Sequence, residues 1–334
     1  MNPQFDIMVT TVCNARCPFC VQEATFKPTQ AAEEAFLTAL RTHFAEFRRQ
    51  GGRRVVITGG EPLLFPQTVL RVLGILAEFR DLEVKAVYTH GRHLLRRLSA
   101  DGRTVAEALR DAGLGCVNLS VHHFDNDVNC RIMRLPVEPT VERMAAQLRK
   151  IGLPFRLDLT LQKDGVASLD DLLRYVEWGF SLGAKDIYVR ELFDIRLTQE
   201  RTDTDRHAVE YCHKHRVPVL PFVQALKHAR DFRLIDETRE SMRDKTEWVF
   251  GYLPAKRQVF LSSLVIGTEC PDGLPYLVLM PDGHLYRGWL GTEDRVANVP
   301  SDDQRSAATP ARSETPSGIT ASLPVTERGC ATEG

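Results

Sequence analysis

We predict an α/β fold with a parallel sheet from three features of the sequence. Six apolar segments of strand length lie in the first 200 residues, and a segment with apolar residues at helical spacing follows each of them. Parallel strands need a crossover connection, usually a helix, so this alternation favours a parallel sheet. The chain of 334 residues is also long enough for one large α/β domain.

Each predicted strand is a short run rich in β-branched and other apolar residues. The strands are residues 5–11, 54–58, 84–89, 116–121, 155–161 and 187–192. The predicted helices carry apolar residues three and four positions apart, and they are residues 30–50, 66–80, segments up to Ala112, 139–151 and 168–182. Three of these helices are followed by glycine, the residue that commonly stops a helix: Gly51, Gly113 and Gly183.

The composition excludes several classes of protein. With 43 basic and 44 acidic side chains the net charge is −1, which gives no electrostatic footprint for nucleic acid. There is no apolar run of membrane-spanning length, and the N-terminal residues do not have the pattern of a signal peptide. Three of the eight cysteines are clustered, which indicates metal binding in a reducing compartment rather than disulfides. We therefore expect a cytoplasmic protein that binds neither nucleic acid nor membrane.

The most informative motif is a cysteine loop directly after the first predicted strand. Cys13, Cys17 and Cys20 form the pattern C-x3-C-x2-C within eight residues. Closely spaced thiolates suit an iron–sulfur cluster, whose usual complement is four cysteines. Three ligands leave one iron open for a substrate or cofactor, as in catalytic metal sites. A zinc site is the alternative, but zinc usually takes four Cys or His ligands in paired spacings.

A second motif, Gly59-Gly60-Glu61-Pro62, follows the second predicted strand. Glycines at a strand end let backbone approach a ligand closely, and Glu61 adds a carboxylate there. In α/β folds ligands bind beyond the carboxyl ends of the strands. The two motifs are therefore expected at the same edge of the sheet.

In order and spacing the two motifs resemble those of the radical S-adenosylmethionine (radical SAM) enzymes, including the aromatic Phe19 before the last cysteine. The similarity extends over residues 5 to about 200. It implies a partial (βα)6 barrel, open on one side. It also implies that Cys13, Cys17 and Cys20 hold a [4Fe–4S] cluster, with SAM on the fourth iron, and that SAM cleavage yields a 5′-deoxyadenosyl radical. A flavodoxin- or ferredoxin-type electron donor is implied as partner.

The resemblance also suggests which residues bind the cofactor. The motif Gly59, Gly60 and Glu61 would face the methionine end of SAM, and Glu61 would accept from its ammonium group. Ser120, at the end of the fourth strand, would meet the ribose. Thr160, at the end of the fifth, would face SAM or substrate, with a polar barrel rim as the alternative. Relatives often have Thr-Asn-Gly where this chain has Thr89-His90-Gly91, so the role of His90 stays open.

Several polar residues near the strand ends are candidates for binding the substrate. His122 and His123, with Asp125 close by, form a polar group unlike a core face. Arg190 would bind a carboxylate or phosphate bidentately, and an ion pair between strands is the alternative. Two arginines after the histidines would hold an acidic substrate, although a solvated face is favoured. The full set of substrate candidates is His122, His123, Arg190, Glu191 and Tyr286; the two arginines are Arg131 and Arg134.

The second half of the chain is predicted to be a C-terminal extension. Residues 203–250 are predicted to be helical, and 258–266 and 276–289 to be strands, with a turn at Pro281-Asp282-Gly283. We expect this hairpin to cover the open side of the barrel. Residues 301–334 have almost no large apolar residue and are predicted to be disordered. The expected domains are thus 1–200, 201–295 and the tail 301–334.

The predicted function is a single-cluster radical SAM enzyme that abstracts hydrogen from a small polar substrate. The only cysteines beyond the sixth strand, Cys212, Cys270 and Cys330, are far apart in sequence, which disfavours auxiliary clusters and hence peptide-maturing enzymes and molybdopterin-type cyclases. The short segment before the cysteine loop disfavours a cobalamin domain. The reaction would be a decarboxylation, dehydration, epimerisation or rearrangement of a sugar acid or nucleoside, and the chain is weakly similar to cytosylglucuronate decarboxylases of nucleoside antibiotic biosynthesis. The alternatives are a peptide- or RNA-modifying radical SAM enzyme and a non-enzymatic iron–sulfur sensor.

Overall fold

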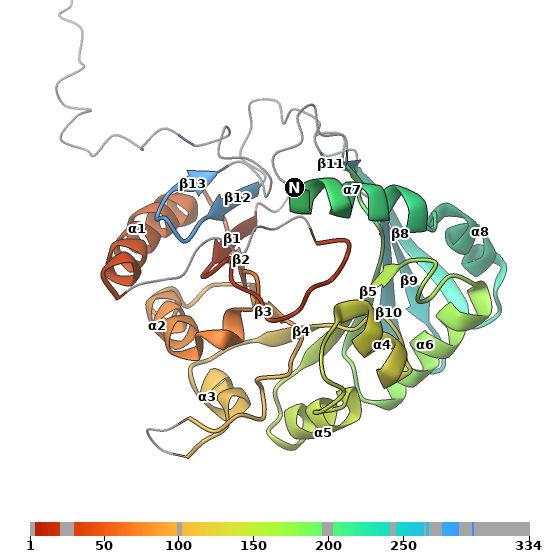
Figure 1. Ribbon diagram of the computed structural model, residues 1–334, viewed down its shortest axis with the longest axis horizontal. Helices are drawn as coiled ribbons and strands as arrows, with labels where there is room; N and C mark the ends of the chain where they lie inside the picture. Colours follow the sequence, from red (N-terminus) through yellow and green to blue (C-terminus); the bar gives the residue numbers. More distant parts are fainter. Residues whose placement is uncertain are drawn as a thin grey trace, which may run out of the picture. The chain divides into compact units, whose positions relative to one another are not determined.

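Six parallel strands form the centre of a curved sheet (Figure 1). The computed structural model describes residues 4–20, 30–98, 102–195, 203–240, 245–263, 265–266, 276–286 and 296. Each central strand pairs in parallel with the next one along the chain. The strands are β1 (Gln4–Met8), β2 (Arg54–Thr58), β3 (Val84–Thr89), β4 (Cys116–Ser120), β5 (Phe155–Leu161) and β6 (Asp186–Glu191). The six predicted strands are confirmed.

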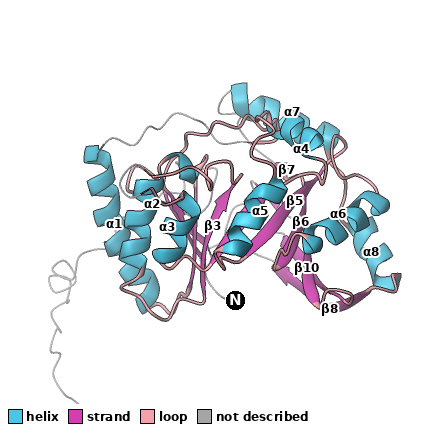
Figure 2. Ribbon diagram, turned by 90° about the horizontal axis from the view of Figure 1, so that it is seen from below, coloured by secondary structure: helices cyan, strands magenta, loops and turns pink. Residues whose placement is uncertain are grey.

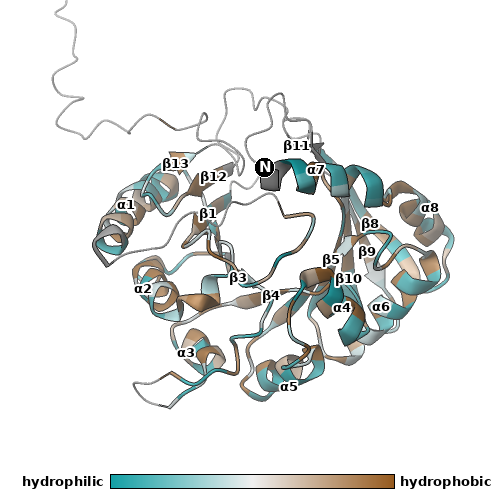
Figure 3. Cartoon of the chain, in the orientation of Figure 1, coloured by the Kyte–Doolittle hydropathy of each residue, from teal (hydrophilic) through white to brown (hydrophobic). Residues whose placement is uncertain are grey.

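Helices cover the outer face of this sheet (Figure 1). They are α1 (Gln30–Arg49), α2 (Pro66–Leu76), α3 (Val105–Asp111), α5 (Val141–Lys150) and α6 (Leu169–Ser181). Alternate strand residues such as Phe5, Ile57 and Leu157 are fully buried in the core that the helices complete. Figure 3 shows β1 and β4 as apolar, and α1 and α5 with both apolar and polar sides. An additional helix, α4 (Asn126–Met133), follows β4 and was not predicted.

The sheet is curved, and its concave face is polar. Arg190 on β6 donates a hydrogen bond from Nη2 to the hydroxyl of Tyr88 on β3 at 2.7 Å. Neighbouring strands lie about 5 Å apart, so side chains three strands apart meet only across a concave surface. Asp6, Asn118 and Asp158 share the alternation of these residues and are buried polar groups. The interior of the barrel thus offers polar side chains to a ligand.

The barrel is open, because among the described residues its first and last strands pair with added strands rather than with each other. β1 pairs in parallel with β12 (Tyr276–Leu279), and β6 pairs in parallel with β10 (Arg257–Ser263). The resulting sheet has 11 strands in the order β13-β12-β1-β2-β3-β4-β5-β6-β10-β9-β8. A separate two-stranded pair joins β7 (Asp194–Ile195) to β11 (Val265–Ile266). The prediction of an α/β partial barrel is confirmed.

The prediction that residues 203–250 are helical is wrong in its second half. Helices α7 (Asp203–His215) and α8 (Leu220–His228) form as expected, but β8 (Phe232–Glu240) and β9 (Lys245–Tyr252) follow them. β9 pairs antiparallel with both β8 and β10. Trp248 and Phe250 are buried at alternate positions. Pairing with a long neighbouring strand thus overrides the charged composition that favoured a helix.

The predicted hairpin around Pro281-Asp282-Gly283 is confirmed, with β12 paired antiparallel to β13 (Leu285–Tyr286). It extends the sheet at the β1 edge. Gly283 has φ +81° in the turn, a value that glycine adopts readily. The tail 301–334 lies outside the described residues, and the division near residue 200 stays a prediction. Among the described residues no helix is both long and apolar enough to span a membrane.

Candidate functional site

The cysteine loop leaves β1 and is held by backbone hydrogen bonds at two places. At its start, the amides of Gly60 and Glu61 donate to the carbonyls of Thr10 and Val12 at 2.8 and 2.9 Å. Further on, the amide of Arg16 donates to the carbonyl at the C-terminus of α4 at 3.0 Å. The two sequence motifs are therefore in direct contact. Figure 2 shows α4 and α7 together at one end of the strands.

The two glycines of the second motif are required by this contact. A Cβ on Gly59 would lie 2.5 Å from the carbonyl oxygen of Thr10, and a Cβ on Gly60 would lie 2.4 Å from that of Val12. Both opposing atoms are backbone and cannot rotate away. The glycines thus let the cysteine loop lie against the end of β2. Their predicted approach to SAM stays a prediction.

The three thiols suit an iron–sulfur cluster by their chemistry. Burial raises the pKa of Cys13 to about 11, and it raises the pKa of Cys17 further, with the neighbouring thiolates acting in the same direction. Cys20 is exposed at the end of the loop. A cation is therefore needed to stabilise the thiolates. No three His, Cys, Asp or Glu side chains within the described part of the chain are arranged around a single metal ion, so donor type rather than preformed geometry identifies the ligands.

Glu61 is buried and ties the end of β2 to the end of β3. It is 1% exposed. Its Oε1 accepts from the Thr89 hydroxyl at 2.6 Å and from the Leu63 amide at 3.0 Å, and its Oε2 accepts from the His90 amide at 3.0 Å. Burial raises the pKa of the carboxyl, while these hydrogen bonds oppose the rise. These contacts are internal, so its predicted contact with the ammonium of SAM stays a prediction.

His90 connects this carboxylate to the cysteine loop. Its Nε2 lies 2.8 Å from Oδ1 of Asn14 and 3.3 Å from Oε2 of Glu61, and its Nδ1 accepts from the Arg92 amide. Both neighbours of Nε2 are acceptors, so Nε2 carries the proton. Burial lowers the pKa of His90 to about 3, so the ring is neutral. Sequence reasoning had left its role open, and the only signal was the departure from Thr-Asn-Gly.

The two predicted histidines after β4 have different environments. His122 is 4% exposed, accepts from the Thr160 amide at Nδ1, and packs edge-on against Phe19 with ring centroids 5.1 Å apart. His123 is only half-buried and accepts from the Asp125 amide. Asp125 caps the N-terminus of α4 by accepting from two of its amides. Of this group, the structure therefore places only His122 beside the cysteine loop.

We predict that His122 makes the protein less stable in acid. Burial lowers its pKa from 6.5 to about 4. The folded protein thus resists protonation that the unfolded chain accepts, and stability is lost as the pH falls from 6.5 toward 4. This amounts to about 2 kcal/mol between pH 6.5 and 5. Thermal unfolding of cluster-free His122→Gln at pH 7 and pH 5 should show a smaller decrease in Tm than wild type. An unchanged decrease, or an equal effect of His123→Gln, would contradict the assignment.

The predicted pair Arg190 and Glu191 is divided between the two faces of β6. Arg190 donates to Asp158 on the neighbouring strand at 2.7 Å. This is the ion pair between strands that was predicted as the alternative to substrate binding. Its Nε is buried and has no hydrogen-bond partner within the described part of the chain. Glu191 lies on the other face, where it accepts from Arg216 at 2.8 Å and from the Val219 amide at the start of α8 at 2.9 Å. The structure thus gives Glu191 internal contacts and leaves Arg190 in the barrel interior.

The remaining predicted residues lie in two different parts of the sheet, the barrel interior and the hairpin at the β1 edge. Ser120 and Thr160 are half-buried at the ends of β4 and β5, on the same face as Asp158 and Arg190. Tyr286 is buried in the hairpin at the β1 edge, where its hydroxyl donates to Asp282 at 2.7 Å. The structure therefore groups Ser120 and Thr160 with the barrel interior, and it gives Tyr286 a contact within its own turn.

Known proteins resemble this chain in sequence and in fold. The model of the Radical SAM superfamily matches residues 7–177. A probable GTP 3′,8-cyclase of Sulfurisphaera tokodaii is 27% identical over 192 residues, which cover 57% of this chain and 56% of the relative. The GTP 3′,8-cyclase of Listeria monocytogenes is 32% identical over 191 residues, which cover 55% and 51%. The chain thus matches about half the length of each of these relatives.

The solved structure of native anSMEcpe with bound AdoMet has a similar fold. It superposes with a TM-score of 0.53 at 12% identity, over 87% of this chain and 77% of that protein. At this identity the likeness concerns the fold alone. The family match, by contrast, spans just over half of the chain and contains both the cysteine loop and the Gly-Gly-Glu-Pro motif. The chain is therefore a member of the radical SAM superfamily, whose enzymes use a [4Fe–4S] cluster and SAM.

Proposed function

We propose that this radical SAM enzyme carries one cluster and abstracts a hydrogen atom from a small polar substrate of the sugar-acid or nucleoside class. The observation that carries the proposal is the contact between the cysteine loop and Gly60-Glu61 at the carboxyl ends of strands whose concave face is polar. In such folds the ligand site lies at this end of the strands. A polar interior favours a hydroxyl- or charge-rich substrate over an apolar one.

In this proposal Cys13, Cys17 and Cys20 hold the cluster, and the other predicted cofactor residues surround SAM. With both cofactors bound, the site gains a radical that removes hydrogen from carbon. The protein itself orients the substrate and excludes water. His122 donates from Nε2, since its Nδ1 already accepts from Thr160, and Arg190 presents its unpartnered Nε. The residues proposed to contact SAM are Phe19, Gly59, Gly60, Glu61, Ser120 and Thr160.

Cys17→Ala should reduce 5′-deoxyadenosine formation by more than roughly a hundredfold, because even partners outside the ligand shell of a metal site are worth ten- to a hundredfold. The measurement uses anaerobically reconstituted protein with dithionite and SAM, and mass spectrometry of the nucleoside product. Cys116→Ala, which changes a cysteine of β4 away from the loop, is the control and should keep its activity. Equal activity of Cys17→Ala and wild type would refute the cluster assignment, and a loaded wild type without product would favour an iron–sulfur sensor.

Two reactions on substrates of this class are candidates. Decarboxylation of cytosylglucuronate rests on the sequence resemblance alone, and the relatives described above do not support it. Cyclisation of GTP is favoured by the names of the two relatives described above, and GTP is likewise a polar compound built on a nucleoside. Both candidates are tested by adding cytosylglucuronate, GTP or short peptides to the reconstituted enzyme. The compound that stimulates 5′-deoxyadenosine formation identifies the class, and stimulation by peptides alone would instead favour a peptide-modifying enzyme.

Iron content tests whether a single cluster is present. We expect about four iron atoms per chain after reconstitution, one [4Fe–4S] cluster, because no second group of closely spaced cysteines occurs in the sequence. Cys212 is buried and lies near Phe19, while Cys270 and Cys330 are outside the described residues. A value near eight would indicate an auxiliary cluster and would favour the cyclase reaction. Colorimetric iron and sulfide analysis on the same sample makes the distinction.

A further inference from the structure

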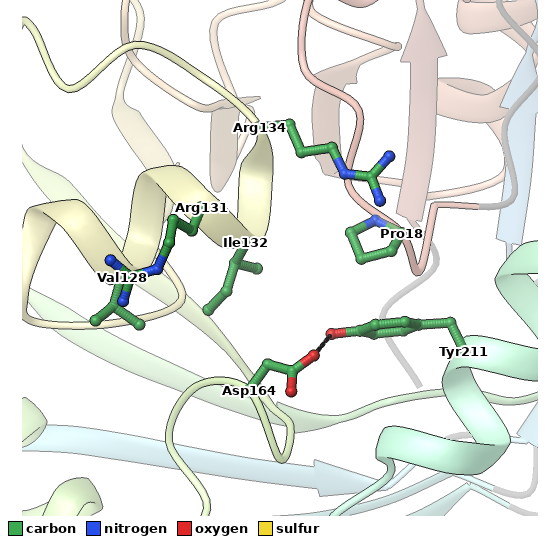
Figure 4. A pocket seen from close by; sticks show the side chains of 7 residues that line it. All are labelled: Pro18, Val128, Arg131, Ile132, Arg134, Asp164 and Tyr211. Carbon is green, nitrogen blue, oxygen red and sulfur yellow. Dashed lines mark hydrogen bonds between the residues drawn. The ribbon is translucent and has the colours of Figure 1, made fainter.

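A pocket of about 450 Å³ lies directly beside the cysteine loop (Figure 4). Pro18, between the second and third cysteines, forms one wall, and residues of α4 form another. Tyr211 on α7 and Asp164 after β5 complete it. A small molecule held here therefore contacts a residue that directly follows Cys17 and precedes Cys20 by two positions. The volume suits a ligand of metabolite size.

Two arginines give this pocket a positive rim. Figure 4 shows the guanidinium of Arg134 beside Pro18, on the side away from Tyr211 in this view, while Arg131 extends along α4 toward Val128. Among the described residues neither side chain makes an ion pair or a hydrogen bond. Other arginines near the barrel form ion pairs: Arg190 pairs with Asp158, and Arg216 pairs with Glu191. A guanidinium without a hydrogen bond or ion pair among the described residues, beside a cavity, is suited to an anion from outside.

The position of Arg134 is fixed by the backbone. It is the C-cap of α4 in the left-handed conformation, with φ 54° and ψ 46°, where glycine or asparagine is usual. Its amide donates to the carbonyl of Cys130, and the carbonyl of the preceding Met133 accepts from the amide of Arg16 in the cysteine loop. The guanidinium is thus carried by a turn that is hydrogen-bonded to the loop itself.

The acidic residue of the pocket already has partners. Asp164 accepts from the Tyr211 hydroxyl at 2.9 Å and lies 3.0 Å from Nδ1 of His215. The Tyr211 hydroxyl lies 2.8 Å from Gln162 as well. The negative charge of Asp164 is therefore directed toward α7 rather than toward Arg134. The arginine side of the pocket remains available to a carboxylate or phosphate.

We propose that Arg134, assisted by Arg131, binds a carboxylate or phosphate of the substrate in this pocket. The proposal rests on the proposed function, and it narrows the substrate to an anionic molecule. Sugar acids and nucleotides both satisfy it, whereas neutral nucleosides do not. The same chemistry is present in the methionine carboxylate of SAM, and the experiment is designed to separate the two sources.

The test measures binding to the reconstituted holoenzyme by equilibrium dialysis. The probes are GTP for a phosphate, glucuronate for a carboxylate, guanosine as the neutral counterpart, and SAM. Arg134→Met should weaken binding of at least one of the two anionic probes by roughly tenfold or more, the loss typical of a charge-assisted hydrogen bond, and leave guanosine and SAM within about twofold. Arg134→Lys should lose less affinity for the anionic probe than Arg134→Met does. Arg41→Met, which removes an exposed arginine of α1, should change nothing.

Several outcomes would overturn the proposal. Wild type that binds neither anionic probe, or Arg134→Met that binds both as wild type does, would show that the pocket is no anion site. An equal loss for SAM would assign the guanidinium to the cofactor. Failure of the proposed function is a separate result, because dialysis requires no turnover. If anion binding depended on Arg134 but no 5′-deoxyadenosine formed, the anion site would be supported and the proposed reaction would be refuted.

A second readout locates the contact. Phenylglyoxal modifies accessible arginines, and peptide mass spectrometry reports which ones. Arg134 should react in the holoenzyme and be protected by the anionic probe that it binds, whereas Arg41 should react equally with and without it. Protection by SAM alone, or no protection at all, would contradict a substrate site.

Discussion

Glu61→Leu should lower the free energy of unfolding by about 3–5 kcal/mol, because it leaves three buried donors without an acceptor. These donors are the Thr89 hydroxyl and the amides of Leu63 and His90. Glu61→Gln should cost less, about 1–3 kcal/mol. Either orientation of the new amide places an NH2 group against one of the two backbone N–H groups. Urea unfolding followed by circular dichroism measures both variants.

A matched control separates burial from charge. Glu34 on α1 is 61% exposed and pairs with Arg71, so Glu34→Gln should change stability by less than about 0.5 kcal/mol. If Glu61→Leu were as stable as wild type but failed to bind SAM, the carboxylate would act on the cofactor and the internal hydrogen bonds would contribute little. If both stability and SAM binding fell, Glu61 would support the site by holding β2 and β3 together.

Gly60→Ala should displace the cysteine loop while the rest of the fold persists. The new Cβ would lie 2.4 and 2.5 Å from the carbonyl oxygen and carbon of Val12, and backbone on both sides must move to relieve this contact. Overpacking of this kind costs about 1–3 kcal/mol. We expect iron content after reconstitution to fall to less than half of the wild-type value. Far-ultraviolet circular dichroism should remain unchanged.

Gly74→Ala is the control for this variant. Gly74 lies within α2, and a Cβ there would meet no atom within 4 Å. Alanine is a better helix former than glycine, so this variant should gain about 0.5–1 kcal/mol and load iron normally. Normal iron loading in Gly60→Ala would show that the contact between the two motifs does not determine the loop geometry.

The central strands were predictable because their outer face is buried, which gives apolar residues at alternate positions, as in β5, or a continuous apolar run, as Val55-Val56-Ile57 in β2. Strands β8 and β9 were not, because β8 carries charged residues such as Arg233 and Glu237 on exposed positions. In its partner β9, the alternation of buried apolar residues that is typical of a strand is limited to Trp248 and Phe250. Helix α4 was missed because it is short and because its cap, Asp125, was interpreted as part of a polar ligand group.

The contact between the cysteine loop and the Gly-Gly-Glu motif followed from a general property of parallel strands, whose carboxyl ends meet at one edge. The partners of individual side chains did not follow. Glu61 and His90 depend on how β2 and β3 end relative to each other, and Glu191 depends on where α8 begins. Arg131 and Arg134 were predicted on a solvated face, and both are exposed. Sequence spacing gave no sign, however, that α4 ends against the cysteine loop.

The pairing of β1 with β12 has a consequence for the order in which the chain folds. Gln4 lies opposite Tyr276, so one edge of the first strand is left unsatisfied on the ribosome until most of the chain has been synthesised. Contacts so distant in sequence slow folding. An uncovered strand edge also invites association between chains. A nascent chain halted before residue 276 should therefore depend on chaperones far more than the released protein does.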